Sequence, residues 1–167
     1  LKREGLIRAY GASTRGADHM EQGPTILDES AFTAMEVPMN VTQREAADAI
    51  LPRAARQGVG TVIRVPLGSG LLTGKYTSLD QFSGDDHRGV ESFRERMSKR
   101  LAAATPFTEM VKDEGVSPVH AALAWVLSRQ GVSVAIPGCK NPAQVEDNVL
   151  ASDVTLSPEF LAKVGGM

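Results

Sequence analysis

The chain has 167 residues, 42% of them hydrophobic, which predicts one globular domain, residues 1–167, with a buried core. Its 18 Lys and Arg residues face 20 Asp and Glu residues, and the net charge of -2 excludes a general attraction to nucleic acid or an anionic membrane surface. A single cysteine, no secretory signal and no apolar run of the roughly 20 residues that cross a bilayer together predict a cytoplasmic protein without membrane partners.

Four short apolar runs lie next to helical patterns, and this alternation predicts βα units with parallel strands. None of the runs alternates cleanly between apolar and polar residues, so we expect both faces of the sheet to be covered. Four units are too few to close a barrel, which typically needs about 250 residues. The count indicates half of a larger structure or a small open sheet, whose edge strands would favour association. The expected strands are residues 6–12, 31–37, 60–65 and 132–136.

Helix starts are the clearest local signals. A capping residue followed by proline predicts helices that begin at Ser117-Pro118, Asn141-Pro142 and Ser157-Pro158. The first of these carries one apolar stripe over residues 118–130 and ends at Gly131, as expected of a helix packed on a sheet.

A further helical region covers residues 91–112, and Pro106 is expected to break or kink it. Before it, residues 76–89 have no periodicity and predict a polar loop.

Residues 64–75, RVPLGSGLLTGK, follow the third expected strand. Three glycines, two hydroxyl side chains and a closing lysine form a flexible loop rich in backbone donors. The loop is not a Walker A motif, because Tyr76 stands after Lys75 where that motif requires Ser or Thr. An ordinary strand-to-helix turn explains the glycines equally well, so a ligand loop and a plain turn both remain open at this point.

Residues 136–148, IPGCKNPAQVEDN, join the fourth expected strand to a helix start. The first helical turn offers unsatisfied N–H groups and the positive end of the helix dipole, Gly138 gives access to the backbone, and Lys140 adds a charge. Phosphate is the anion that this arrangement predicts. The alternative is a capped helix beside a solvated lysine.

Taken together and in order, these motifs resemble the C-terminal half of an aldo-keto reductase, in the branch similar to the potassium-channel β subunits. The resemblance rests on IRAYGAS, RVPLGSGLLTGKY and AIPGCKNPAQVEDN, and it extends through QREAADAILPRAARQGVG and SPVHAALAWVLSRQGVSVAIPG. It implies a TIM (β/α)8 barrel that binds NADP(H), to which this chain contributes half, the equivalents of strands five to eight.

The resemblance also implies roles for individual residues. Ser13 would lie near the nicotinamide, residues 64–69 with Lys75 would surround the nicotinamide ribose and pyrophosphate, and Gly138 with Lys140 would hold the 2'-phosphate. The residues around the adenosine ribose and adenine complete the set. The implied cofactor-binding residues are Ser13, Arg64, Val65, Pro66, Leu67, Gly68, Ser69, Lys75, Gly138, Lys140, Gln144, Asp147 and Asn148.

Three positions depart from the family's pattern. Thr14 stands where many members have Asn, and Glu36 stands where many have Gln, which leaves open how the carboxamide would be recognised. Arg64 replaces an aromatic ring that stacks on the nicotinamide in many members, although arginine could also stack or pair with phosphate.

The family's catalytic Tyr, Lys, Asp and His come from its first four strands, so the resemblance implies no catalytic residue in this chain. Tyr10, His19 and His120 are interpreted as structural or surface residues, His87 as part of a solvated loop, and Cys139 as a small residue at the phosphate turn. No metal site is predicted.

Two main hypotheses follow for function. The first is the NADP(H)-binding half of a carbonyl-reducing oxidoreductase, inactive alone because a proton donor is missing, and associated with an N-terminal half. The second is a self-associating half-barrel, a homodimer, that binds a nucleotide or a protein partner without redox chemistry. A structural remnant that binds no ligand is a third and lesser alternative.

Overall fold

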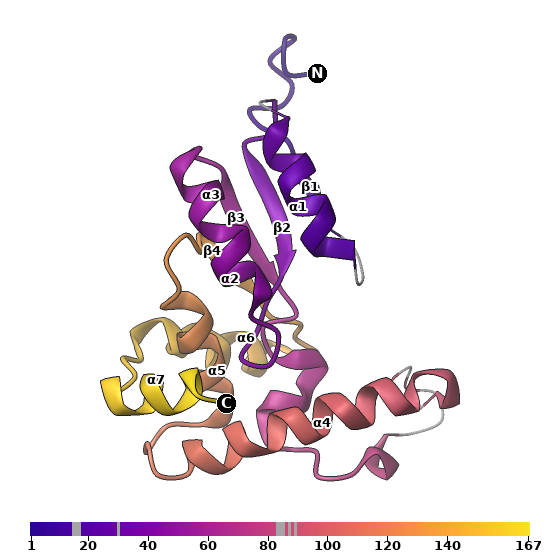
Figure 1. Cartoon of the computed structure of the whole chain (residues 1–167), viewed down its shortest axis with the longest axis vertical. Coiled ribbons are helices and arrows are strands. Elements are labelled where there is room, and N and C mark those ends of the chain that lie inside the picture. Colours follow the sequence, from indigo (N-terminus) through magenta and orange to yellow (C-terminus); the bar gives the residue numbers. More distant parts are fainter. Residues whose placement is uncertain (15–17, 30, 83–85, 87, 89) are drawn as a thin grey trace. The chain divides into compact units, whose positions relative to one another are not determined.

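The computed structural model describes residues 1–14, 18–29, 31–82, 86, 88 and 90–167 (Figure 1). His87 therefore lies outside the described residues. The chain divides into two compact units. The first contains Leu1–Met39, Gln43–Pro66 and Val126–Gly138, and the second contains Asn40–Thr42, Leu67–Trp125 and Cys139–Met167. The expectation of a single domain stays a prediction.

A four-stranded parallel sheet forms the first unit (Figure 1). The strands pair in sequence order, β1-β2-β3-β4, with Ala34 opposite Gly60 and Val62 opposite Val134 in the register. All four predicted strands are present, but β1 begins later than expected because residues 1–10 form exposed turns and extended chain. The strands are β1 Gly11–Ser13, β2 Ala34–Pro38, β3 Gly60–Arg64 and β4 Val134–Ile136.

Three helices belong to the connections of this sheet: α1 His19–Asp28, α2 Glu45–Ala49 and α3 Leu51–Arg56. Helix α1 contacts β2 and α2, and α3 contacts β3. Since right-handed crossovers between sequential parallel strands put their helices on one side, these helices cover a single face of the sheet.

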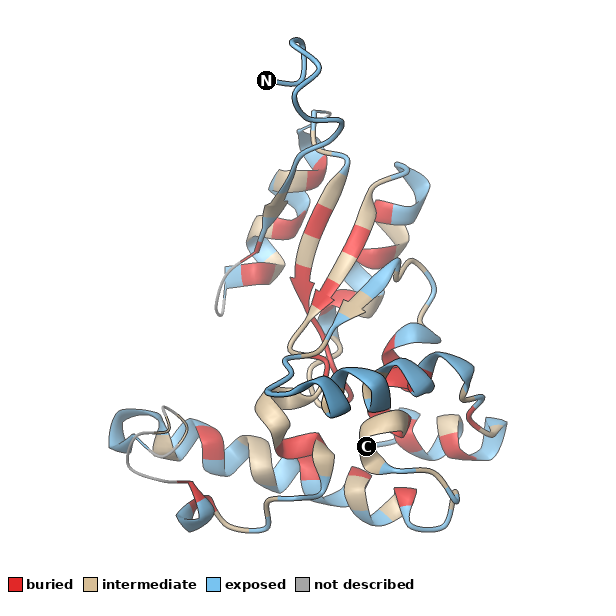
Figure 2. Ribbon diagram, turned by 180° about the vertical axis from the view of Figure 1, so that it is seen from behind, coloured by how far each residue is buried: buried red, intermediate tan, exposed pale blue. Residues whose placement is uncertain are grey.

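Burial along the two central strands alternates, as Figure 2 shows. Met35, Val37 and Ile63 point to the helix-covered face and are essentially inaccessible to solvent. Glu36 and Val62 point to the opposite face and are only half-buried. In the described structure, the expectation that both faces are covered is therefore wrong.

The second unit consists of helices and short 3-10 turns. The three predicted capped starts are confirmed, because the side chains of Ser117, Asn141 and Ser157 each accept a hydrogen bond from a backbone N–H of the first helical turn. None of the described helices is both long and apolar enough to span a bilayer. The elements are η2 Gly68–Thr73, η3 Leu79–Gln81, α4 Glu91–Val111, α5 Pro118–Leu127, α6 Pro142–Leu150, η4 Ala151–Asp153 and α7 Pro158–Gly165; the last residues of α5 belong to the first unit.

Helix α4 continues through Pro106, where the sequence predicted a break or a kink. The break is wrong, and the kink stays a prediction. Proline removes one backbone donor, but Phe107 and Val111 on its C-terminal side are fully buried. The ring of Phe107 lies 6.0 Å from that of Phe160 on α7, centroid to centroid. Tertiary packing therefore holds the helix together across the missing hydrogen bond.

Candidate functional site

A polar cluster lies at the carboxyl ends of β1, β2 and β3. Arg64, the last residue of β3, donates from Nη2 to the backbone oxygen of Thr14 at 2.9 Å, and its Nε lies 3.5 Å from Oε1 of Glu36. Ser13 pairs with Glu36 in the strand register. One guanidinium therefore links β3 to β2 and to the residue that follows β1. The parallel strands place the predicted residues Ser13 and Arg64 at the same carboxyl end of the sheet.

Thr14, one of the three departures from the family's pattern, serves the sheet itself. Its side chain is fully buried, and both its N–H and its hydroxyl donate to the backbone oxygen of Glu36, at 3.0 and 3.1 Å. The hydroxyl is therefore committed to joining β1 to β2. The Glu36 carboxylate, in turn, faces the positive charge of Arg64.

The chain after β3 contains non-glycine residues with positive φ. Val65 has φ +55° in the first unit, and Ser69 has φ +60° in the second. This conformation costs roughly 1–2 kcal/mol for residues other than glycine, and a β-branched residue rarely adopts it. Such strain concentrates at ligand-binding segments and switches, because the surrounding structure must impose it.

Within the second unit, the Gly68–Gly70 turn, defined here as residues 68–70, is left-handed throughout, with φ of +58°, +60° and +90°. The N–H groups of Gly70 and Leu72 donate to the oxygen of Leu67 at 2.9 and 3.2 Å, and Leu72 is fully buried. Lys75 is exposed, and its backbone N–H donates to the Thr73 hydroxyl. The loop is thus anchored by buried leucines and leaves its lysine in solvent.

The turn before α6 is organised by hydrogen bonds among predicted site residues. Asn141 accepts from the Gln144 N–H at 3.0 Å, and the Gln144 side chain accepts from the Lys140 N–H at 2.7 Å. Asn148 donates to the Cys139 sulfur at 3.1 Å. The structure therefore gathers Lys140, Gln144 and Asn148 around one helix start.

Gly138 precedes this turn and is exposed. A Cβ added there would meet no atom within 4 Å, and its φ does not require glycine. The backbone at Gly138 is therefore unobstructed, and its approach by a ligand stays a prediction.

Asp147 makes a contact that the sequence did not predict. His120 Nε2 lies 2.9 Å from the backbone oxygen of Asp147 and 3.0 Å from its Oδ1. Both residues belong to the second unit, so this contact fixes α6 to α5. His120 thereby has a structural partner on the helix that was expected to meet adenine.

The predicted site residues divide between the two units. A site that combines both units stays a prediction. The first unit holds Ser13, Arg64, Val65, Pro66 and Gly138, and the second holds Leu67, Gly68, Ser69, Lys75, Lys140, Gln144, Asp147 and Asn148.

Sequence reasoning missed one strongly engaged residue. Arg88 falls in the segment that was predicted to be a polar loop, yet its side chain is only 12% exposed and is paired with Asp86. The available signal was the spacing of Asp86 and Arg88, two residues apart, in a segment that also contains Tyr76 and Phe82. This combination could have indicated an ion pair packed against aromatic rings.

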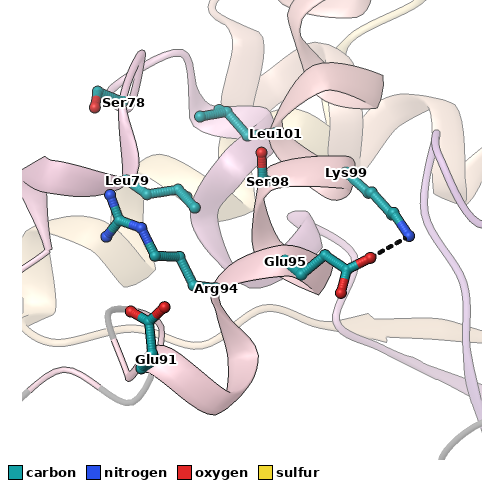
Figure 3. A pocket seen from close by; sticks show the side chains of 8 residues that line it. All are labelled: Ser78, Leu79, Glu91, Arg94, Glu95, Ser98, Lys99 and Leu101. Atoms are coloured by element: carbon teal, nitrogen blue, oxygen red, sulfur yellow. Dashed lines mark hydrogen bonds and ion pairs between the residues drawn. The ribbon is translucent and has the colours of Figure 1, made fainter.

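A shallow hollow of about 590 Å³ lies beside α4 and contains none of the predicted site residues (Figure 3). Arg94 in its lining is paired with Asp80, and Lys99 is paired with Glu95 at 2.7 Å. The hydrogen bond from Arg94 lowers the pKa of Asp80. The hollow is lined by Ser78, Leu79, Glu91, Arg94, Glu95, Ser98, Lys99 and Leu101.

Comparison with known proteins decides the family. The sequence model of the Aldo/keto reductase family matches residues 1–166 of this chain. The chain belongs to the aldo/keto reductase family. Its four parallel βα units are half of the TIM barrel of that family.

Three curated relatives are 28–32% identical to this chain over the aligned residues. Aldo-keto reductase YhdN of Bacillus subtilis (strain 168) is 32% identical over 145 residues, which are 85% of this chain and 43% of the relative. Aldo-keto reductase yakc [NADP(+)] of Schizosaccharomyces pombe is 28% identical, with 96% and 48% covered. An NADH-specific methylglyoxal reductase of Escherichia coli (strain K12) is 29% identical, with 94% and 47% covered.

The solved structure of a glycerol dehydrogenase from Gluconobacter oxydans matches with a TM-score of 0.75 and 27% identity. The match covers 99% of this chain and 50% of the dehydrogenase. The chain thus spans about half the length of the relatives that it matches.

Proposed function

We propose that this chain is the NADP(H)-binding half of an aldo-keto reductase that reduces carbonyl compounds. The observation that carries the proposal is the turn before α6. There, the exposed lysine Lys140 immediately precedes the start of α6, whose positive dipole end adds to the lysine's charge, a combination suited to a phosphate group.

The other cofactor contacts are proposed from the same half of the barrel. Arg64, held at the strand ends by Thr14 and Glu36, presents a fixed cation, and the left-handed Gly68–Gly70 turn presents backbone groups. NADPH, when bound, supplies a hydride for the carbonyl carbon. The groups that would supply the proton are expected on the family's first four strands, so we propose that this chain does not turn over carbonyls alone.

The choice of NADP(H) over NAD(H) rests on Lys140. One relative bears NADP(+) in its name and another is described as NADH-specific, so membership of the family does not fix the choice. An ammonium group beside a helix N-terminus favours the additional negative charge of a 2'-phosphate.

Lys140→Ala should raise the dissociation constant for NADPH about tenfold to a hundredfold, because a charge-assisted hydrogen bond contributes roughly 1.5–3 kcal/mol. The dissociation constant for NADH, which lacks the 2'-phosphate, should change less than about twofold on the same scale. Fluorescence titration of both cofactors measures this difference. Lys163→Ala, at an exposed lysine on α7 of the same unit, is the matched control and should alter neither constant. Failure of the unmodified chain to bind NADPH at millimolar concentration would refute the proposal.

A second candidate function, self-association without redox chemistry, is favoured by the sheet edges. Within the described sheet, β1 and β4 each pair with a single neighbour, and Val134 and Ile136 on β4 are 44% and 47% exposed. Apolar edges with unpaired backbone groups promote pairing with another chain. Two copies related by a two-fold axis could place β4 of each beside β1 of the other, as in a closed barrel.

Sedimentation velocity tests this candidate. We expect a homodimer that Ile136→Lys converts to monomer, because a buried charge at a strand edge opposes pairing. Lys75→Glu, a charge change at an exposed loop residue of the other unit, should leave the dimer intact. A monomeric species for the unmodified chain at all concentrations would contradict the prediction.

A further inference from the structure

Arg88 connects residues of the second unit that lie well apart in the sequence. Its Nη1 donates to the backbone oxygen of Ser69 at 2.9 Å, and its Nη2 donates to the Tyr76 hydroxyl at 3.4 Å. The guanidinium carbon also lies 4.3 Å from the ring centroid of Phe82 and 5.0 Å from that of Tyr76. A single side chain therefore contacts three points of the segment between Leu67 and Phe82.

Asp86 fixes the orientation of this guanidinium. Its Oδ1 accepts from Arg88 Nε at 2.9 Å and from the Arg88 backbone N–H at 3.0 Å, and its Oδ2 pairs with Nη2. The side chains of Arg88 and Asp86 are only 12% and 18% exposed. Such a two-pronged, largely desolvated pair is more rigid than an exposed ion pair.

The turn that Arg88 contacts needs external support. Ser69 has φ +60° and ψ +28°, a left-handed conformation that costs roughly 1–2 kcal/mol for a non-glycine residue. The charge-assisted hydrogen bond to its carbonyl is of the right size to offset this cost. Gly70 permits the approach, since a Cβ there would lie 3.0 Å from Arg88 Nη1.

The bond to Ser69 also sets the direction of the adjoining peptide groups. At the start of the turn, Leu67 with φ -95° is followed by Gly68 with φ +58°, and backbone N–H groups in such a turn can form a concavity that binds anions. A segment held by only its glycines would sample many conformations, because glycine visits both halves of φ space. The contact with Arg88 therefore selects one conformation of the turn before any ligand arrives.

We propose that Arg88 is a positioning residue that holds the Gly68–Gly70 turn in the left-handed form that receives the cofactor's pyrophosphate. The role in binding rests on the proposed function, whereas the hold on the turn does not. Because the pyrophosphate is common to both nicotinamide cofactors, loss of Arg88 affects NADPH and NADH alike. Arg88 thus differs from Lys140, which acts on one of them.

The experiment uses the full chain with Arg88→Met, Arg88→Lys and the control Arg94→Met, which removes an exposed arginine of the same unit paired with Asp80. Hydrogen exchange without ligand should show amides of residues 68–74 exchanging about tenfold faster in Arg88→Met and unchanged in Arg94→Met. The dissociation constants for NADPH and NADH should both rise about tenfold, with their ratio unchanged. Arg88→Lys should resemble Arg88→Met, because lysine cannot reach three partners with one planar fork.

Each outcome supports or overturns the proposal. Unchanged exchange in Arg88→Met shows that the turn holds itself, and faster exchange with unchanged affinity shows that the cofactor does not depend on the turn; either result overturns the inference. A change confined to NADPH would assign Arg88 to the 2'-phosphate and also overturn it. If the unmodified chain binds neither cofactor, the proposed function fails. The hydrogen-exchange rates of residues 68–74 then still test whether Arg88 stabilises the turn.

Should Arg88→Met unfold the unit, Asp86→Asn provides the second variant. It keeps the size of the side chain, removes the ion pair, and should shift exchange and both affinities in the same direction by a smaller factor. An increase in exchange with Asp86→Asn that leaves both affinities unchanged would again overturn the positioning role.

Discussion

Phe107→Ala should lower the free energy of unfolding of the second unit by about 3–5 kcal/mol. Phe107 is fully buried in α4, and its ring lies 6.0 Å from that of Phe160, so truncation removes apolar contacts and leaves a cavity. Urea unfolding followed by the fluorescence of Trp125, which is buried in the same unit, measures the loss. A domain is stable by only about 5–15 kcal/mol, so this change should visibly weaken the fold.

The matched control is Phe93→Ala in the same helix. Phe93 is 39% exposed and lies beneath the Arg96 guanidinium at 4.6 Å. Its truncation should cost about 1 kcal/mol or less, since an exposed cation–π contact contributes roughly 0.5–1 kcal/mol. Equal losses for the two variants would show that Phe107 is not a core residue.

Ile63→Ala should cost about 2–5 kcal/mol in the first unit, because Ile63 is fully buried between Val37 and Ala135 in the strand register. Far-UV circular dichroism during thermal or urea unfolding measures the effect. Val62→Ala, one residue earlier on β3, is the control and should cost about 1 kcal/mol, as its side chain points to the half-buried face. A larger loss for Val62 than for Ile63 would reverse our assignment of the two faces.

The presence of the four strands could be predicted from the sequence, but the start of β1 and the covered face of the sheet could not. Along β3, the polar residue Thr61 is buried and the apolar residue Val62 is only half-buried, the reverse of the usual arrangement. The alternation of apolar and polar residues expected of a strand with one covered face is therefore not visible in the sequence. Thr61 can be buried because its hydroxyl donates to the Gly131 oxygen at 2.5 Å. That partner is distant in sequence, so no local pattern reveals it.

The break that local rules allow at Pro106 does not occur, since those rules do not include the burial of Phe107 and Val111 beyond it. The helix start at Asn141-Pro142 was predicted well, because a cap depends only on neighbouring residues. Arg88 and the contact between His120 and Asp147 were missed for the opposite reason. Their partners are brought close by loop and helix packing, which periodicity and capping rules do not describe.

The internal hydrogen bond from the Lys140 N–H to Gln144 Oε1 has an energetic consequence for any anion that binds before α6. An anion that takes this N–H must first displace the glutamine oxygen, so one acceptor replaces another and the backbone contributes little net free energy. Recognition then becomes an exchange reaction in which the ammonium group of Lys140 supplies most of the preference for charge. A small neutral acceptor gains almost nothing over the resident glutamine, and the turn is therefore protected against weak competitors such as water.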